Sequence, residues 1–333
     1  MIELGISYYG CLFKEHIKQD IRQLSHNGVN AIVLAVSEYE ASVWFDRLKE
    51  IIEFIKLQGM KVYWNFWAWG GLFGGEAASK YLQDSIDDRQ VDVNGKKVSA
   101  ICPSSSDFRN YMKSWIEDVL KETDVDGFFW DEPHYFGAYS GGESLTCYCE
   151  RCKNLFMERY SVPPPNELTK EFAEFREGLM LDFLLDLLST VKRLNSKAIN
   201  IVCLLPEKNP IAGIFNWDKV AKLDVVDVIA SDPYWSLYGK DLEWYKNIVT
   251  DIISIAKNTK KKSQIWLQLF MLPKDEIKNL EPAVKFAIKQ GVDSIFAWTY
   301  KAAEGQFLTS EDPAMTWHQL MLIYREIRRV MKI

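Results

Sequence analysis

The sequence lacks the short motifs of several common enzyme classes. It has no glycine-rich phosphate-binding loop, no metalloprotease pair of histidines and no serine at a sharp nucleophile turn. Histidine itself is scarce, with four in 333 residues. These absences give no support to phosphate-loop, metalloprotease or serine-hydrolase chemistry, so candidate groups are sought among carboxylates, thiols and aromatic rings.

Excess positive charge and long apolar runs are also missing. A formal net charge of −6 and a sequence pI near 5.5 provide no basic surface for a phosphate backbone, so a neutral substrate is expected rather than a nucleic acid. No apolar run reaches the length that spans a bilayer, and the first residues lack a basic segment followed by an apolar one. These features predict a cytoplasmic protein without a membrane partner, and they leave self-association as a homo-oligomer open.

Short apolar runs alternate with helical patterns along the chain, which predicts parallel strands joined by right-handed helical crossovers. The expected strands are 3–10, 31–37, 61–66, 127–131, 199–205, 226–231, 264–270 and 294–299. The expected helices are 14–26, 40–58, 106–122, 170–195, 240–258, 274–289 and 313–331, with a weak one at 216–222. Eight repeats favour one α/β domain over residues 1–333, a (β/α)8 TIM barrel, over a doubly wound open sheet.

Two long insertions follow strands on the expected catalytic face of this barrel. One runs over 67–104 after the third strand and contains Asn94-Gly95, a strong hairpin signal. The other runs over 133–167 after the fourth strand. Loops of this length in a compact domain are usually functional, so both are expected to surround the mouth of the barrel.

Four of the six cysteines lie in these insertions. Cys147, Cys149 and Cys152 fall within six residues, and Cys102 lies in the other insertion. Four thiolates can enclose a tetrahedral zinc ion, and such a closed site would be structural and would join the two loops. The alternatives are free thiols or a disulfide, the latter disfavoured in a reducing cytoplasm. Cys11 and Cys203 are expected to be small buried residues on strands.

The strongest catalytic candidates directly follow the fourth predicted strand, where barrel enzymes carry their chemistry. Asp131 and Glu132 are adjacent there, and Glu132 is the expected proton-donating acid. Neighbouring side chains on a strand face opposite ways unless the strand ends between them. The alternative interpretation is a helix-capping or salt-bridged acidic pair.

Further polar and aromatic side chains follow or lie near the ends of the other strands. Hydrogen-bonding groups framed by aromatic faces suit a sugar better than a phosphate, although most of the twelve Trp must serve core packing. Asp232 is a candidate second carboxylate. The candidate substrate-binding residues are Glu38, Trp64, Asn65, Trp67, Trp69, His134, Glu207, Tyr234, Trp235, Gln268, Trp298 and Tyr300.

From Cys102 to about Tyr160 the sequence resembles the family 42 glycoside hydrolases, which are β-galactosidases. The matching elements are Cys102-Pro103-Ser104 with Phe108-Arg109, the strand ending at Glu132, and Cys147-x-Cys149-x-x-Cys152 followed by Phe156. The resemblance implies zinc on the four cysteines and an acid/base role for Glu132. This chain is too short for that family's additional C-terminal domains.

Two departures from this family change the expected mechanism. Asp131 stands where the family has Asn, and 263–270 on the seventh strand has no carboxylate where the family carries its nucleophile. An adjacent Asp-Glu pair is similar to the hexosaminidases of families 20 and 123, in which the substrate's own acetamido group attacks the anomeric carbon. That resemblance implies that Asp131 orients the acetamido group, with Tyr234 or Tyr300 as a hydrogen-bond donor to it.

Three hypotheses follow from the sequence. The leading one is an exo-acting β-N-acetylhexosaminidase that uses Glu132 and Asp131. The second is a conventional glycosidase in which Glu132 works with Asp232 or Glu207. The third is a carbohydrate-binding protein that has kept its pocket and lost its nucleophile. All three expect an oligosaccharide or glycoside as the ligand.

Overall fold

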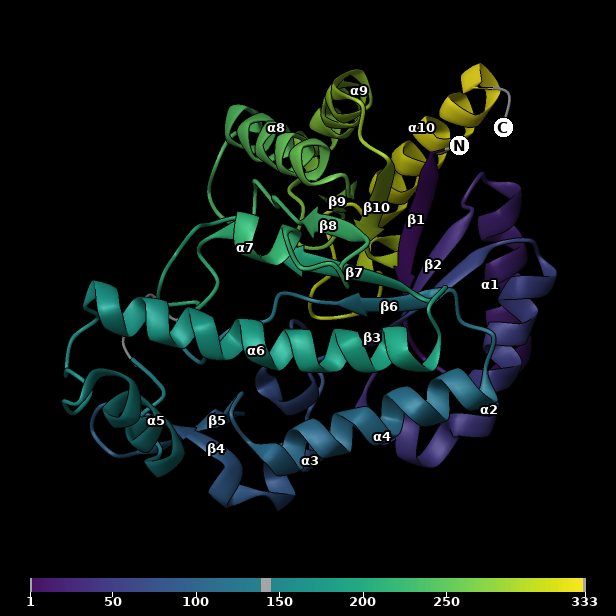
Figure 1. The fold of residues 1–333 in the computed structure, drawn as a ribbon. Helices are drawn as coiled ribbons and strands as arrows, with labels where there is room; N and C mark the ends of the chain where they lie inside the picture. The colour runs from purple at the N-terminus through teal and green to yellow at the C-terminus, as the bar shows by residue number, and fades with distance from the viewer. Residues whose placement is uncertain (1, 139–144, 332–333) are drawn as a thin grey trace.

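A computed structural model describes residues 2–138 and 145–331 of the chain. Eight parallel strands close into a barrel in the order β1-β10-β9-β8-β7-β6-β3-β2, with helices around it (Figure 1). The strands are β1 (Glu3–Tyr8), β2 (Ala31–Val36), β3 (Lys61–Phe66), β6 (Gly127–Trp130), β7 (Ile199–Leu204), β8 (Val228–Ser231), β9 (Lys262–Gln268) and β10 (Ser294–Trp298). The predicted (β/α)8 barrel and all eight predicted strands are confirmed.

The strands are apolar throughout because both of their faces are buried. On β2, Ala31, Val33 and Ala35 face the inside of the barrel, whereas Ile32 and Leu34 face the helices. The same alternation holds on the other strands, as parallel sheets covered on both faces require. The barrel interior is therefore a packed core below the site at its mouth.

The barrel helices follow the sequence pattern with one change. They are α1 (Lys14–His26), α2 (Glu38–Leu57), α4 (Ser106–Glu122), α6 (Lys170–Leu194), α7 (Trp217–Ala221), α8 (Leu242–Thr259), α9 (Leu280–Gln290) and α10 (Pro313–Met331). The helix predicted over 274–289 is instead a 3-10 helix, η3 (Lys274–Asn279), followed by α9. The predicted weak helix is the short α7. None of these helices combines the length and the apolar character that crossing a bilayer requires, among the residues described.

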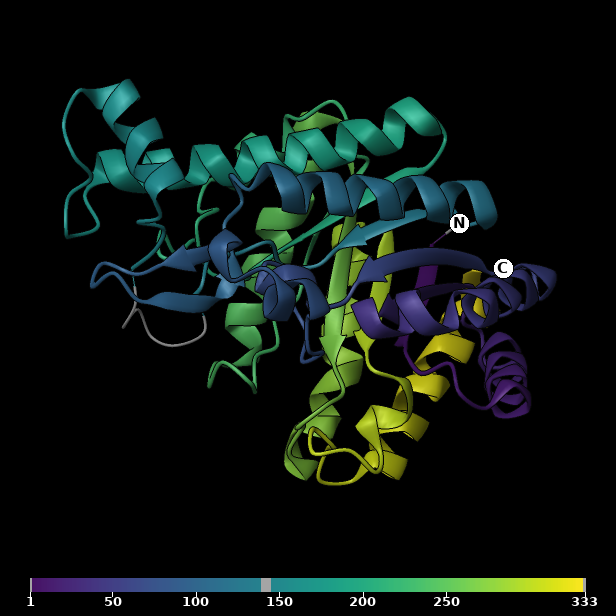
Figure 2. The same cartoon turned by 90° about the horizontal axis from the view of Figure 1, so that it is seen from below.

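The two insertions carry the remaining elements. The first holds η1 (Trp69–Gly71), α3 (Lys80–Asp84), η2 (Ile86–Asp88) and the antiparallel hairpin of β4 (Arg89–Val91) and β5 (Lys97–Ile101), which confirms the hairpin at Asn94-Gly95. The second holds α5 (Glu150–Tyr160), while its residues 139–144 lie outside the described part. A further 3-10 helix, η4 (Tyr300–Ala303), follows β10. The hairpin and α5 lie at the same end of the barrel in both views (Figures 1 and 2).

Gly5 on β1 makes room for an aromatic ring inside the barrel. A Cβ atom on Gly5 would lie 2.1 Å from the Phe296 ring, which contacts Trp266 and Tyr63 within the inner core. Core overpacking costs about 1–3 kcal/mol because neighbouring side chains must leave their preferred rotamers. The variant Gly5→Ala should therefore lower the free energy of unfolding by about this amount, as measured by urea denaturation.

Gly178 on α6 provides the control for this substitution. Its added Cβ would meet nothing closer than Arg159 Nη1 at 3.6 Å, so Gly178→Ala should stabilise the helix by up to about 1 kcal/mol. Adding Phe296→Leu to Gly5→Ala should restore part of the lost stability. If Gly5→Ala left the free energy of unfolding unchanged, the Phe296 ring would not require the absence of a Cβ atom at position 5.

Candidate active site

Asp131 and Glu132 leave the end of β6 and reach the same cavity. The strand ends at Trp130, and Glu132 has a left-handed backbone with φ of +40°, which breaks the alternation of a strand. A non-glycine residue in this conformation is strained, and such strain is concentrated at functional sites. The Glu132 N–H still donates to the carbonyl of Cys203 on β7 at 3.0 Å. The neighbouring strand therefore fixes the backbone that presents both carboxyl groups.

A cavity of about 310 Å³ lies at this mouth of the barrel. This volume falls within the range of about 300–1,000 Å³ that is typical of small-ligand sites. Its walls combine carboxyl groups with aromatic and aliphatic side chains, and the described lining residues include no lysine, arginine or histidine. They are Gly75, Glu76, Asp131, Glu132, Asp232, Tyr234, Leu237, Tyr238, Phe270, Met271, Trp298 and Leu308. We call this space the acidic cavity.

Asp232, which directly follows β8, is hydrogen-bonded to Glu132. Burial raises the pKa of Asp232 well above its usual range, and the nearby charge and hydrogen bond of Glu132 raise it further. The Cys203 thiol also forms a hydrogen bond with the Asp232 carboxyl group. The Oδ1 atom of Asp232 is buried without a hydrogen-bond partner among the described residues. The raised pKa means that Asp232 keeps its proton to a higher pH than an isolated carboxyl group does, and a protonated Asp232 can donate to Glu132.

Asp131 also has a raised pKa. Its buried position raises its pKa well above the usual range, and the charges of Glu132 and Glu76 act in the same direction. Asn65 on β3 donates from Nδ2 to Asp131 Oδ2 at 3.4 Å, which partly offsets this effect. Asn65 thus contacts a predicted catalytic residue from inside the barrel, as its position on the strand requires.

Glu76 is a fourth carboxyl group that sequence reasoning missed. Glu76 is exposed to solvent as a residue, but partial desolvation of its carboxyl group raises its pKa, and the charge of Glu132 acts in the same direction. It follows the run Gly74-Gly75 in the first insertion, where a Cβ on Gly74 would lie 2.8 Å from Glu132 Oε2. The Gly74 N–H donates to the Asp131 carbonyl at 2.9 Å. The paired glycines are the only sequence signal for this close approach of the loop.

Several predicted substrate-binding residues line or support the acidic cavity. Tyr234 and Trp298 form part of its wall. Trp67 lies behind the wall, where a Cβ on Gly75 would meet its ring at 2.0 Å. Gln268 at the end of β9 is fully buried and holds two segments of the wall, since it accepts from the Leu237 N–H and donates to the Phe270 carbonyl.

Six predicted binding residues lie away from this cavity, and we correct these assignments. Trp64 and Trp69 pack on the outer face of the barrel, where Trp69 donates to the Val36 carbonyl. Trp235 is buried against Tyr245 and donates to Glu276. Tyr300 packs between Tyr8 and Trp317. Glu38 accepts hydrogen bonds from Gly70, Ser79 and Tyr81 in the first insertion. Glu207 is half-exposed and forms an ion pair with Lys240.

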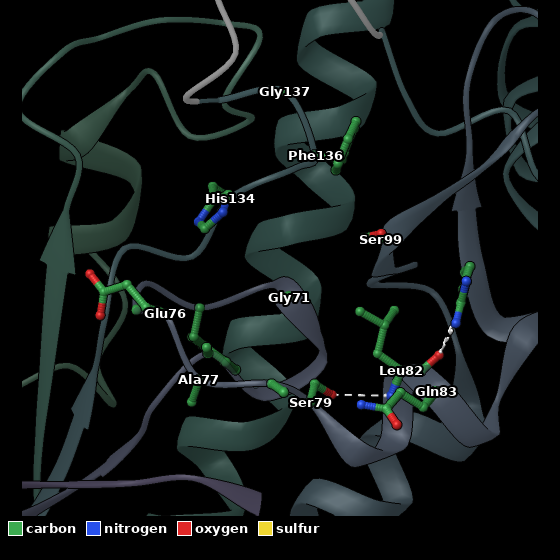
Figure 3. Close-up of a pocket in the computed structure, with 15 residues that line it drawn as sticks. Gly71, Glu76, Ala77, Ser79, Leu82, Gln83, Ser99, His134, Phe136 and Gly137 are labelled. Atoms are coloured by element: carbon green, nitrogen blue, oxygen red, sulfur yellow. Dashed lines mark hydrogen bonds between the residues drawn. The ribbon is translucent and has the colours of Figure 1, made fainter. Parts of the chain in front are cut away.

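His134 lines a second cavity, of about 490 Å³, between the two insertions (Figure 3). The ring Nδ1 contacts the Glu132 carbonyl oxygen, so this nitrogen carries the hydrogen. Burial lowers the pKa of His134, which favours the neutral imidazole. Gly75 and Glu76 line both cavities, so the second cavity adjoins the acidic one.

The four predicted metal-ligating cysteines meet where the two insertions touch. The sulfur atoms of Cys102, Cys147, Cys149 and Cys152 all lie within 4.8 Å of one another, and all four residues are buried. Cys102 Sγ lies 3.4 Å from Cys152 Sγ and 3.6 Å from Cys149 Sγ. Tetrahedral zinc, with Zn–S bonds of about 2.3 Å, places its sulfur ligands about 3.8 Å apart. The spacing fits such an ion.

Two arginines lie next to these cysteines: Arg176 is buried, and Arg151 is half-buried and also forms an ion pair with Asp88. The thiol groups of Cys102 and Cys149 act electrostatically on Arg151, and those of Cys147 and Cys152 act on Arg176. Arg176 has no carboxylate partner among the described residues, and its Nε is buried without a hydrogen bond. Uncompensated buried cations are costly, and thiolates offset them where neutral thiols do not. The residues present therefore fit a metal held by thiolates.

No protein-family profile matches the chain, and no curated protein sequence matches it. Solved structures do resemble it. A β-galactosidase from the Antarctic haloarchaeon Halorubrum lacusprofundi aligns over 98% of this chain and 58% of its own, with 15% identity and a TM-score of 0.78. The catalytic domain of a Paenibacillus polymyxa β-amylase aligns over 96% of this chain and 97% of its own, with 13% identity and a TM-score of 0.70.

A family 42 β-galactosidase from G. stearothermophilus aligns over 99% of this chain and 57% of its own, with 12% identity and a TM-score of 0.75. The likeness to family 42 that the sequence indicated is thus confirmed at the level of the fold. The chain spans less than two thirds of the two β-galactosidases. Sequence identities this low support a shared barrel fold only, so the chemistry must be inferred from the residues of the site itself.

The raised pKa of Asp232 makes stability depend on pH in a defined direction. A group that binds its proton more tightly in the folded state contributes stability below its unfolded pKa of about 3.9, and this contribution is lost as the pH rises towards the folded pKa. The variant Asp232→Asn keeps a hydrogen-bond donor to Glu132 and has no charge to bury. Its melting temperature should exceed that of the wild type at pH 8, and the difference should shrink towards pH 4.

Thermal unfolding of both proteins across this pH range measures the effect. Asp275→Asn is the matched control, because Asp275 is exposed and the same substitution there should give no pH-dependent gain. A wild-type protein as stable as Asp232→Asn at pH 8 would mean that Asp232 ionises without cost.

Proposed function

We propose that this protein is an exo-acting glycoside hydrolase that removes β-N-acetylhexosamine units by substrate assistance. The observation that carries the proposal is the adjacent pair Asp131 and Glu132 in one buried cavity, together with a neutral amide, Gln268, at the end of β9. A cavity of about 310 Å³ suits a single terminal sugar. The fold shared with β-galactosidases and other glycoside hydrolases agrees with this reaction class.

In the first step, the acetamido carbonyl oxygen of the substrate attacks the anomeric carbon. The glycosidic C–O bond breaks, and the departing oxygen takes its electron pair and a proton from Glu132. Asp131 accepts from the acetamido N–H, which orients the group and stabilises its developing positive charge. Tyr234 is the candidate donor to the acetamido oxygen.

In the second step, a water molecule attacks the anomeric carbon. The Glu132 carboxylate now takes a proton from this water, and the bond between the anomeric carbon and the acetamido oxygen breaks, with its electron pair returning to the amide. The configuration at the anomeric carbon is retained. The protein needs no carboxylate nucleophile.

Asp232 lies beside the acid as its hydrogen-bond partner. Burial raises the pKa of Asp232, so this group keeps its proton to a higher pH than an isolated carboxyl group does. In the proposed mechanism this hydrogen bond positions Glu132, and the substrate that enters the cavity takes the place of Asp232 as the partner of Glu132. Asp232 is thus a positioning residue in this mechanism.

The same contact supports a second candidate function. Asp232 lines the cavity beside Glu132, so a conventional glycosidase could use it as nucleophile or base on another sugar such as a β-galactoside. The half-exposed Glu207 lies outside the cavity lining and is the weaker partner. Retaining glycosidases separate their two carboxyl groups by about 5–5.5 Å to admit the anomeric carbon. A direct hydrogen bond makes the pair closer than that, which favours substrate assistance.

Hydrolysis of 4-methylumbelliferyl N-acetyl-β-glucosaminide and β-galactoside tests these candidates. The wild type should cleave the first. Glu132→Gln should lower kcat/KM by about 10²–10⁴-fold, the usual contribution of a general acid, while the exposed Glu207→Gln should have no effect. Asp232→Asn should lose less than tenfold, since the acetamido group is the nucleophile.

Other outcomes identify the alternatives. Galactoside cleavage that Asp232→Asn abolishes would establish the two-carboxylate mechanism. Inhibition by a thiazoline analogue of the cyclic intermediate would support substrate assistance, since intermediate mimics bind more tightly than substrates. Sugar binding without turnover of either glycoside, unaffected by Glu132→Gln, would indicate a binding protein.

We also propose that Cys102, Cys147, Cys149 and Cys152 hold one structural zinc ion. The ion would have four protein ligands and no open position, so its contribution is to fix the two insertions that form the cavity walls. The sulfur spacing and the buried Arg176 support this.

Metal analysis of the purified protein tests the zinc proposal. The wild type should carry about one zinc ion per chain, and Cys149→Ser should carry close to none and melt several degrees lower, because metal binding is part of the folding free energy of such sites. Cys11→Ala removes another buried thiol and should keep the metal. A wild type that binds no zinc on titration, with all four thiols reduced, would contradict the proposal.

A further inference from the structure

The second cavity adjoins the acidic cavity and has a different chemical character. At about 490 Å³ it is the larger of the two, and it lies between the first insertion and the chain that follows Glu132. Figure 3 shows Glu76 and His134 on one side of it, Phe136 and Gly137 above, and Leu82, Gln83 and Ser99 on the opposite side. The two reaction steps proposed above involve no residue that lines the second cavity alone.

The two cavities meet at Gly75 and Glu76, which line both. This junction lies next to the Glu132 carboxyl group, since a Cβ on the preceding Gly74 would lie 2.8 Å from Glu132 Oε2. Glu132 itself lines the acidic cavity only, and the chain that follows it leads to His134 in the wall of the second cavity. The general acid must contact the oxygen that joins the two sugars, so the sugar that departs lies on the Glu132 side.

The walls of the second cavity suit a neutral, hydroxyl-rich ligand. They offer an aromatic ring from Phe136, an imidazole from His134 and hydrogen-bonding groups from Gln83, Ser99 and Arg89. A few polar groups beside an aromatic surface are typical of sugar sites. Arg89 forms no ion pair within the described part of the chain, and it donates through Nε and Nη2 to the Leu82 carbonyl. Its remaining donor group is suited to a hydroxyl.

We propose that the second cavity binds the leaving-group sugar of an oligosaccharide substrate, with Glu76 and Gly75 at the junction between the two sugars. This inference rests on the proposed glycoside hydrolase function and adds the class of substrate, a saccharide linked to a second saccharide. Remote contacts of this kind supply binding energy that raises the rate at the reacting bond. The enzyme accordingly prefers oligosaccharides to glycosides with small leaving groups.

Ala78 offers a variant that fills the second cavity alone. It is exposed, lines that cavity and takes no part in the acidic one. Ala78→Trp places an indole in the space for the second sugar. Lys80→Trp is the matched control, because Lys80 is exposed on α3 and adds the same ring outside both cavities.

Two substrates separate the cavities kinetically. N,N′-diacetylchitobiose needs room for its leaving sugar, whereas N-acetyl-β-glucosaminyl fluoride releases a single atom. Ala78→Trp should lower the ratio of kcat/KM for the disaccharide to that for the fluoride by at least tenfold, and Lys80→Trp should leave this ratio unchanged. An equal loss on both substrates, or none, would overturn the inference.

Binding without turnover makes the test independent of the proposed mechanism. Calorimetric titration of chitobiose into Glu132→Gln, with and without Ala78→Trp, measures the second cavity directly. Affinity should fall at least tenfold when Ala78 is replaced. The inference would be overturned if the disaccharide bound equally well with Trp at this position, or if it failed to bind at millimolar concentration. Tight binding without cleavage by the wild type would overturn only the proposed hydrolysis.

Discussion

Four carboxyl groups share one cavity without a positively charged side chain among its described lining residues, and the rest of the site depends on how this repulsion is relieved. Glu76, Asp131 and Asp232 all have raised pKa values, with burial as the largest cause in each case. Raised pKa values mean that these groups keep their protons to a higher pH, which relieves part of the repulsion. The proposed mechanism requires a general acid that carries a proton. In that mechanism, the crowding of carboxyl groups would also serve the reaction.

The scaffold supports this arrangement from two directions. From below, the barrel fixes the backbone, since the Glu132 N–H is bonded to β7 while its left-handed conformation turns its carboxyl group into the cavity. From above, the first insertion comes so close that a Cβ at position 74 would lie 2.8 Å from Glu132 Oε2 and would displace that carboxyl group. The cysteine cluster ties this insertion to the second, which carries His134 away from the site. Strain at Glu132 is therefore tolerated because its surroundings are held on both sides.

The sequence was sufficient to predict the barrel, its eight strands, the hairpin and the cluster of four cysteines, because each has a local signal. It also predicted that Asp131, Glu132, Asp232, Tyr234 and Trp298 would share one site. The error at Trp64 follows from alternation, since Tyr63 faces the inside of the barrel and Trp64 must face the helices. Trp235 lies beyond the end of β8, where no strand pattern fixes the direction of a side chain. Glu76 could not be predicted, because its approach to Glu132 depends on how the loop folds back. Tertiary contacts of this kind leave no periodic pattern.

Gln268 shows why the missing carboxylate on β9 is consistent with the rest of the cavity. Its amide accepts from the Leu237 N–H and donates to the Phe270 carbonyl, so both ends of the side chain are used in shaping the wall. An ionised Glu at this position would accept the first hydrogen bond, but it would set an oxygen against the Phe270 carbonyl and add a fifth acid to the cluster. Burial, which already raises the pKa values of Asp131 and Asp232, would then have to raise the pKa of the added acid as well. A wall built on a neutral amide therefore fits a reaction in which the substrate brings its own nucleophile.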